Sequence, residues 1–187
     1  MKYEKYAELV KSHKDRIYSH ALYSLRDVHD AEDVTQETFL KLWHSYDEID
    51  SVRVAGWLTK VVHNLCIDMV RRRKSQQKNF GHPDAEAVDT LPSVTKSYTD
   101  PEHGLDRDEQ QQTLINALAT LPAETQSVMI MHYFQEMKLH EIGEALGKSV
   151  SALKVQIHRA RKSLRLVLMN DGENSFPTKA PAKRGIG

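Results

Sequence analysis

The cationic side chains between residues 148 and 165 are the part of this sequence best suited to binding another molecule. No acidic residue occurs in this stretch. Lysine and arginine donate hydrogen bonds to phosphate oxygens and to the O6 and N7 atoms of guanine. On a helix these side chains would share one polar face, which is typical of a helix that enters the major groove of DNA. The residues of this face are Lys154, His158, Arg159, Arg161, Lys162 and Arg165.

Two short helices joined at a glycine are predicted to position this cationic face. Apolar residues at positions 139–146 keep helical spacing, and Gly147 tolerates a positive φ angle. Ser149 or Ser151 can cap the second helix. The pattern predicts a helix-turn-helix, although a solvated amphipathic helix with a chance basic bias also fits this segment by itself. The apolar underside of the second helix consists of Val150, Leu153, Ile157, Ala160, Leu164 and Leu168.

The charge balance and the cysteine content limit the class of protein. Lysine plus arginine equals aspartate plus glutamate, at 26 each in 187 residues, so the whole chain has no net field that attracts DNA. The single cysteine, Cys66, excludes an internal disulfide and a multi-cysteine zinc site, and its apolar neighbours predict burial. No apolar run reaches the roughly 18–20 residues that span a bilayer, and the charged N-terminal segment lacks a signal-peptide core. We therefore expect a cytoplasmic protein without direct membrane insertion.

The first third of the chain has the apolar spacing of three amphipathic helices. Apolar positions at intervals of three and four mark the first helix between residues 6 and 25. Asp30 is a candidate N-cap for the second helix, with Asp33 three residues later, as in a capping box. The third helix is predicted over residues 54–74 and ends in a basic run. Strand periodicity is absent from the sequence.

Composition divides the chain into two helical parts. Residues 75–105 contain three prolines and more acids than bases, which predicts a flexible linker. Helical spacing resumes over residues 106–169, with a break at Pro122, and residues 170–187 are predicted to be a disordered tail. The predicted fold is all-α, with two small helical domains, 1–74 and 106–169, joined by the linker.

Three segments of the chain resemble a known protein family. Residues 30–43 and 56–74 resemble region 2 of bacterial sigma factors, and residues 114–164 resemble region 4. Their order and spacing are similar to those of the extracytoplasmic-function (ECF) group, which retains only these two regions. The resemblance implies a factor that binds core RNA polymerase, recognises the minus-35 and minus-10 promoter elements and promotes DNA opening for a stress or envelope regulon. The implied partners are core RNA polymerase, promoter DNA as duplex and as melted non-template strand, and a membrane-associated anti-sigma factor.

The resemblance implies that the second helix docks on a coiled coil of the largest polymerase subunit. An acidic surface beside apolar anchors suits a protein partner and repels DNA phosphates. Acids in the first turn of a helix are also favourable by themselves, which explains Glu32 and Asp33 equally well. The implied polymerase-binding residues are Asp30, Glu32, Asp33, Gln36, Glu37, Phe39, Leu40 and Trp43.

The third helix is implied to hold the melted strand of the minus-10 element. Asn64 occupies the place of an asparagine in the family's base-reading region, and its amide can donate to and accept from a base edge. The loop at residues 45–53 would form part of the pocket for an unstacked base. Trp57 can stack on DNA, but its place on an apolar stripe favours the core. The implied minus-10 residues are Tyr46, Lys60, His63, Asn64, Arg71, Arg72 and Arg73.

The minus-35 readers of the family correspond to one face of the helix that follows Gly147. Lys154 and Arg159 can reach guanine or phosphate, and Gln156 can pair with adenine. Family members often have serine and arginine where this chain has Val155 and Gln156, so its DNA preference is expected to differ. Val155 can make only apolar contacts, for instance with a thymine methyl group. The implied readers are Lys154, Val155, Gln156, His158 and Arg159.

Two other protein classes share parts of this pattern. A response regulator ends in a similar helix-turn-helix, but its upstream receiver domain is usually α/β, and residues 1–74 show no strand periodicity. His140 and Glu141 begin like the HExxH motif of zinc proteases, but the fifth residue is Glu144 rather than histidine. We therefore expect no catalytic residue, no cofactor and no metal site.

Overall fold

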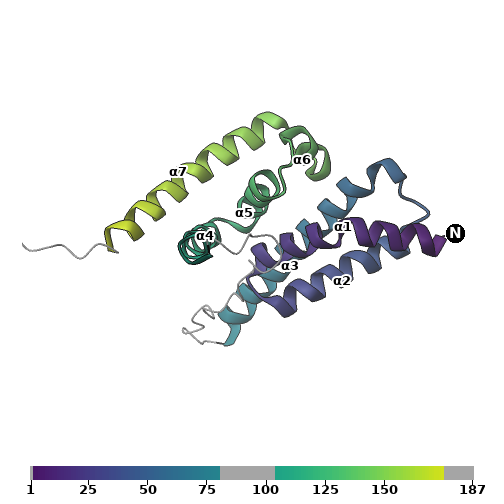
Figure 1. The fold of residues 1–187 in the computed structure, drawn as a ribbon, viewed down its shortest axis with the longest axis horizontal. Coiled ribbons are helices and arrows are strands. Elements are labelled where there is room, and N and C mark those ends of the chain that lie inside the picture. Colours follow the sequence, from purple (N-terminus) through teal and green to yellow (C-terminus); the bar gives the residue numbers. More distant parts are fainter. Residues whose placement is uncertain (1, 81–103, 175–187) are drawn as a thin grey trace, which may run out of the picture.

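The computed structural model describes residues 2–80 and 104–174, with side chains over 2–76 and 112–169, and shows helices joined by short turns (Figure 1). Within these residues there is no strand, so the all-α prediction is confirmed. The N-terminal part consists of α1 (Lys2–Leu25), α2 (Val28–His44), the 3-10 turn η1 (Ser51–Arg53) and α3 (Val54–Phe80). The C-terminal part consists of α4 (Gly104–Ala119), α5 (Ala123–Met129), the π-helical turn η4 (Ile130–Phe134), α6 (Leu139–Leu146) and α7 (Val150–Asn174).

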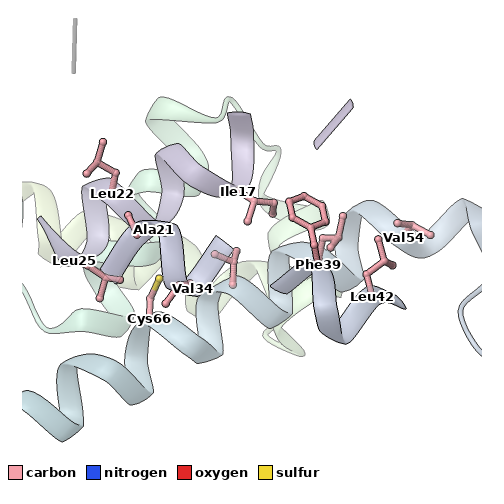
Figure 2. Close-up of a cluster of buried hydrophobic side chains, with 12 residues drawn as sticks. Ile17, Ala21, Leu22, Leu25, Val34, Phe39, Leu42, Val54 and Cys66 are labelled. Carbon is pink, nitrogen blue, oxygen red and sulfur yellow. The ribbon is translucent and has the colours of Figure 1, made fainter. Parts of the chain in front are cut away.

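The first three long helices form a bundle around one apolar core. Each contributes residues spaced three or four apart, such as Ile17 and Ala21 of α1 and Leu58 and Val62 of α3, and these side chains are almost fully buried. Figure 2 shows the same core from α1 through α2 to Cys66 of α3. Cys66 is 1% exposed, so its predicted place in the core is confirmed, and burial raises the pKa of its thiol to about 12.

The start of α2 differs from the prediction. The N-cap is Asp27, whose carboxylate accepts a hydrogen bond from the backbone N–H of Asp30 at 2.9 Å. Arg26 has a positive φ of 57°, which ends α1 and turns the chain immediately before Asp27. The expectation that Asp30 caps this helix is therefore wrong; Asp30 lies in its first turn.

The C-terminal helices surround a second apolar core. Buried side chains from α5, α6 and α7, including Val128, Ile142 and Leu153, meet at its centre. Pro122, predicted to break the helical spacing, is the N-cap residue of α5 and makes no side-chain cap hydrogen bond. The π-helical turn closes with a hydrogen bond from the Gln135 N–H to the Ile130 carbonyl at 3.1 Å and leads into α6.

Three helix boundaries lie outside the predicted ones. Helix α3 continues to Phe80 and α7 to Asn174, beyond the predicted ends at 74 and 169. Residues 75–80 contain no glycine or proline, so nothing in them breaks a helix before Gly81. Helix α4 begins at Gly104, two residues before the predicted second domain. The rest of the predicted linker (81–103) and of the predicted tail (175–187) lies outside the described residues.

The two helical parts pack against each other. Helices α5 and α6 face α1 and α3, while α7 lies on the side away from the bundle (Figure 1). The sequence predicted two domains on a linker and gave no indication of this contact. It brings α5 and α6 against the helix that carries the predicted minus-10 residues.

Candidate polymerase and DNA interfaces

Helix α2 presents an acidic outer surface. Glu32, Asp33, Gln36 and Glu37 are all exposed, and Glu37 forms an ion pair with Lys41 one turn later at 3.0 Å. This surface can approach a basic partner without first breaking a core contact. An exposed i,i+4 pair of this kind holds its side chains only weakly.

Asp30 differs from these acids because it is held by the bundle. Its carboxylate is paired with the guanidinium of Arg73 from α3. The same guanidinium donates to the Leu25 carbonyl at the end of α1, at 3.1 Å. Arg73 of α3 therefore joins the end of α1 to the first turn of α2. Arg73 was predicted to contact minus-10 DNA, but in this structure its guanidinium binds the Asp30 carboxylate and the Leu25 carbonyl of the same chain.

Two apolar side chains extend the acidic surface. Leu40 is 53% exposed and Trp43 is 37% exposed, and they lie one helical turn apart, so they give this surface a small apolar patch. Trp43 packs edge-on against Tyr6, with ring centroids 5.0 Å apart. Phe39, by contrast, is only 7% exposed and lies in the core among Ile17 and Leu42 (Figure 2). The prediction that Phe39 is a surface anchor does not fit this structure.

Helix α3 presents a second polar surface. Lys60, Asn64 and Arg71 are exposed, and their spacing of four and seven residues places them on one side of the helix. Arg72 is exposed beside them. Asp68 lies on the same side and pairs with Arg71 at 3.8 Å, so this acid orients a neighbouring guanidinium.

Two half-buried aromatic residues near this surface have different neighbours. Tyr46 is half-buried, with the Lys2 ammonium 5.5 Å from its ring centroid. Trp57 is half-buried and packs against the first core. The favoured expectation that Trp57 belongs to the core is confirmed.

His63 is the predicted minus-10 residue that the structure removes from the surface. It is 7% exposed, and its Nδ1 lies 2.7 Å from the Ser127 hydroxyl of α5. Burial, and next the nearby Lys148, lower the pKa of His63 to about 4. With its ring enclosed between the two parts of the molecule, His63 is shielded from DNA in this arrangement, and its predicted contact with minus-10 DNA requires the two parts to separate.

Three buried polar residues join the two parts, and we call them the histidine–serine cluster: His20, Ser127 and His63. The Ser127 hydroxyl also lies 2.9 Å from Nε2 of the fully buried His20. Because a hydroxyl carries one hydrogen, Ser127 can donate to only one ring and must accept from the other. Burial, then His63 and Arg16, lower the pKa of His20 to about 3. The cluster is therefore built from uncharged imidazoles.

Glutamine side chains add contacts between the two parts. The buried Gln126 donates to the Tyr23 carbonyl at 3.1 Å, which satisfies one of the backbone acceptors at the end of α1. Gln135 donates to the Arg16 carbonyl at 2.9 Å. Sequence patterns missed these residues; the signal available was a polar residue at an apolar helix position, as with Ser127 beside Val128.

The helix-turn-helix has the predicted glycine turn. Gly147 ends α6 with a φ of 67°, and the Ser149 hydroxyl accepts from the Ala152 N–H at 3.2 Å, so Ser149 rather than Ser151 caps α7. Gly143 is also required, because a Cβ there would lie 2.6 Å from the Lys148 carbonyl oxygen. These contacts fix the angle at which α7 leaves α6.

The outer face of α7 is open to solvent. Lys154, His158 and Arg159 are exposed, and Val155 is 51% exposed. Gln156 is half-buried, and its Nε2 donates to the Thr125 hydroxyl of α5 at 3.1 Å. Val155, Gln156 and Arg159 border a groove of about 690 Å³ between α7 and the start of α5. Three of the predicted readers thus lie along one groove, and Thr125 is a neighbour that sequence patterns did not indicate.

The described residues show neither a cluster of metal-ligand side chains nor a membrane-spanning helix. No group of three His, Cys, Asp or Glu side chains there converges as metal ligands. The Glu141 carboxylate accepts from the Lys138 N–H at 2.7 Å and so caps α6. No described helix is both long and apolar enough to cross a membrane.

Both parts of the chain match known protein families. Residues 9–76 match the family described as Sigma-70 region 2, and residues 111–164 match Sigma-70, region 4. The ECF RNA polymerase sigma factor SigW of Bacillus subtilis is 33% identical over 166 residues, covering 86% of this chain and 87% of SigW. The ECF sigma factor SigE of Mycolicibacterium smegmatis is 34% identical over 159 residues, covering 84% of this chain and 59% of SigE.

Two solved structures share the fold. The sigma factor RpoE, crystallised with the anti-sigma factor NepR from Bartonella quintana, has a TM-score of 0.70 at 18% identity and covers 89% of this chain and 98% of its own. CnrH, in complex with the cytosolic domain of CnrY, has a TM-score of 0.64 at 24% identity and covers 90% of both chains. The two family matches, the SigW relationship and the two-part helical fold agree with each other, and the chain belongs to the ECF family of RNA polymerase sigma factors.

Proposed function

We propose that this chain binds core RNA polymerase through α2, reads the minus-35 duplex with α7 and holds the melted non-template strand of the minus-10 element on α3. The polymerase performs the chemistry, which places the chain in the cytoplasm as a specificity subunit without catalytic residues. The observation that carries the proposal is the exposed polar side of α3, where Lys60, Asn64 and Arg71 lie together.

Each surface has the chemistry that its role needs. The Asn64 amide can read a base edge while the neighbouring cations hold phosphates. The exposed lysine and arginine of α7 can reach guanine or phosphate in a duplex. The exposed acids of α2, with Leu40 and Trp43 as apolar anchors, suit a basic and partly apolar protein surface. In the minus-10 set we retain Tyr46, Lys60, Asn64, Arg71 and Arg72; Arg73 is held within the N-terminal bundle, and His63 becomes available only when the two parts separate.

The substitution Asn64→Ala tests the strand-holding role. We expect it to reduce run-off transcription from core polymerase by roughly five- to a hundredfold, since one bidentate base contact contributes roughly 1–3 kcal/mol. Permanganate reactivity of promoter thymines should fall in parallel, while co-elution with core polymerase stays unchanged. Loss of core binding in this variant would contradict the assignment.

Charge reversal at Lys154 and Arg159 provides the matched test of α7. The double variant should weaken protection of upstream duplex in the holoenzyme, and its salt dependence should become shallower because phosphate contacts are lost. Melting on a template whose minus-10 region is already mismatched should be retained. Unchanged upstream protection would remove α7 from the proposal.

We further propose that an anti-sigma protein, membrane-associated in the intact cell, holds the chain inactive and that the genes it controls respond to envelope or other stress. The support is the closed packing, in which Arg71 is paired with Glu124 of α5 at 3.4 Å, so that part of the strand-holding surface is occupied. Both structural relatives were solved with a second protein. Affinity capture from cross-linked cells, with transcript profiling after overproduction of the chain, tests both statements.

A further inference from the structure

The Gln156 side chain is held by a hydrogen bond to another helix, unlike the exposed side chains of Lys154, His158 and Arg159. It is half-buried at the edge of the groove between α7 and α5, and its Nε2 donates to the Thr125 hydroxyl at 3.1 Å. Thr125 belongs to α5, outside the helix-turn-helix, and the two residues are 31 positions apart. A contact across two helices restricts the glutamine in a way that a neighbour on α7 would not.

The orientation of a glutamine amide decides which base it can read. The terminal torsion of glutamine has a broad, roughly two-fold preference, so an unrestrained amide can exchange its oxygen and nitrogen. The hydrogen bond to Thr125 uses one of the two N–H groups of Nε2 and fixes the amide plane. One N–H and the Oε1 acceptor remain, and this pair matches the N7 acceptor and N6 donor that adenine presents in the major groove.

The surroundings of the groove favour the same base pair. Val155 is 51% exposed beside Gln156, and Leu121, Pro122 and Ala152 contribute further apolar surface. An apolar surface of this kind suits the C5-methyl group of the thymine paired with that adenine. The groove therefore offers an oriented amide and an apolar contact for one A·T pair.

We propose that Thr125 is a positioning residue for minus-35 recognition: by holding the Gln156 amide, it makes this chain select adenine at one position of the upstream duplex. The inference rests on the proposed function, because it requires α7 to lie in a major groove. It adds a specificity determinant that lies on α5 rather than on the recognition helix.

The test is selection from a duplex library randomised over the upstream element, with the full-length chain bound to core polymerase. The unmodified chain should prefer adenine at one position by roughly five- to a hundredfold, the range of a bidentate contact. Thr125→Val keeps the shape and removes the hydroxyl, and it should reduce this preference to about a third or less. Affinity for random-sequence duplex should stay within about twofold, since phosphate contacts supply most non-specific binding.

Three single variants and one double variant separate positioning from a general loss of structure. Thr125→Ser restores a hydroxyl and should restore the preference. Thr120→Val removes the hydroxyl of an exposed threonine that directly follows α4 and donates to the Ala117 carbonyl. This control variant should leave the adenine preference unchanged. Gln156→Ala should abolish the preference, and adding Thr125→Val to it should cause no further loss, because the two residues act through one contact.

Three other results would contradict the positioning role of Thr125 or the proposed role of α7. If Thr125→Val retains the adenine preference, Thr125 has no positioning role. If that variant weakens all duplexes equally, the residue only supports the structure. If the unmodified chain selects no base anywhere in the upstream duplex, the proposed role of α7 is wrong and the inference is wrong with it.

Discussion

Two glycines in the described helices show how differently the same residue type can be constrained. At Gly143 in α6, a methyl group would lie 2.6 Å from the Lys148 carbonyl oxygen, which belongs to the backbone of the turn. At Gly56 in α3, a methyl group would meet nothing within 4 Å. The sequence shows a glycine in a predicted helix in both cases, and only the packing distinguishes them.

We predict opposite effects on stability for the two alanine substitutions. Gly143→Ala forces the turn to move and should lower the free energy of unfolding by about 1–3 kcal/mol. Gly56→Ala removes a flexible residue from a helix and should raise it by roughly 0.5–1 kcal/mol. Urea unfolding followed by circular dichroism measures both. Equal effects of the two substitutions would contradict the close approach at Gly143.

Single residues also mark the limit of what the sequence could predict at the candidate site. Asn64, Lys154 and Arg159 could be placed because family spacing and polar type agree with the exposed helix faces found here. His63 could not, because a histidine next to the base-reading asparagine is equally compatible with a DNA contact and with burial. Its environment is supplied by Ser127, 64 positions away, and no local pattern contains that information.

At the scale of the elements, the number and order of helices followed from apolar periodicity, whereas helix ends depended on local contacts. Asp27, Asp30 and Asp33 all occur near the start of α2, and each is a suitable N-cap residue. The positive φ of Arg26 decides among them by placing Asp27 in extended conformation at the helix start. The predicted acidic surface was unaffected, because the shift changes the cap and not the exposed side.

A pair of alanine substitutions should separate the cap from the docking surface. Asp27→Ala removes the hydrogen bond to the Asp30 N–H and should lower stability by about 1 kcal/mol, with core polymerase binding retained. Asp33→Ala removes an exposed acid and should weaken core binding with little change in stability. Thermal unfolding and a core-binding titration measure the two effects. The docking proposal for α2 would be contradicted if both variants bound core polymerase as tightly as the unmodified chain.

At the scale of the whole molecule, the contact between the two parts is what sequence reasoning could not supply. Periodicity identifies surfaces that must be buried because they are apolar, but this contact places buried polar groups beside apolar ones such as the Tyr23–Phe134 ring pair. Gln126, Gln135 and the histidine–serine cluster all join helices more than 60 positions apart. Such residues appear in a sequence as ordinary surface or core positions until the fold brings their partners together.

Acidification should separate the two parts. The pKa values of His20 and His63 are lowered to about 3 and about 4 in the packed arrangement, whereas exposed histidines titrate near 6.5. The separated form therefore binds more protons below pH 6.5, so packing is fully stabilised above that pH and weakens as the pH falls from 6.5 towards 4. Between pH 7.5 and 5.5 the opening equilibrium should rise roughly a hundredfold if both rings titrate normally once exposed.

Other charged groups near the cluster have to be considered in the same experiment. Arg16 faces His20 and lowers the pKa of its ring. Lys148 and Glu124 face His63: the cation lowers the pKa of its ring and the acid raises it. Energy transfer between dyes on Lys11→Cys and Lys162→Cys reports the separation, and the buried Cys66, whose pKa is raised to about 12, should not react with the labels. A chain with both histidines changed to glutamine should show no transition in this range; an unchanged transition would assign it to other groups.

The ion pair between Arg71 and Glu124 makes promoter binding an exchange rather than a simple addition. The guanidinium that would hold a phosphate of the melted strand is shared with α5 and with Asp68. DNA and the protein's own carboxylates therefore compete for one cation, and dissolved ions weaken both pairings. The internal pair is solvent-exposed, and salt weakens the several phosphate contacts of the strand more steeply than one such pair, so promoter opening should decrease steadily as the ionic strength rises.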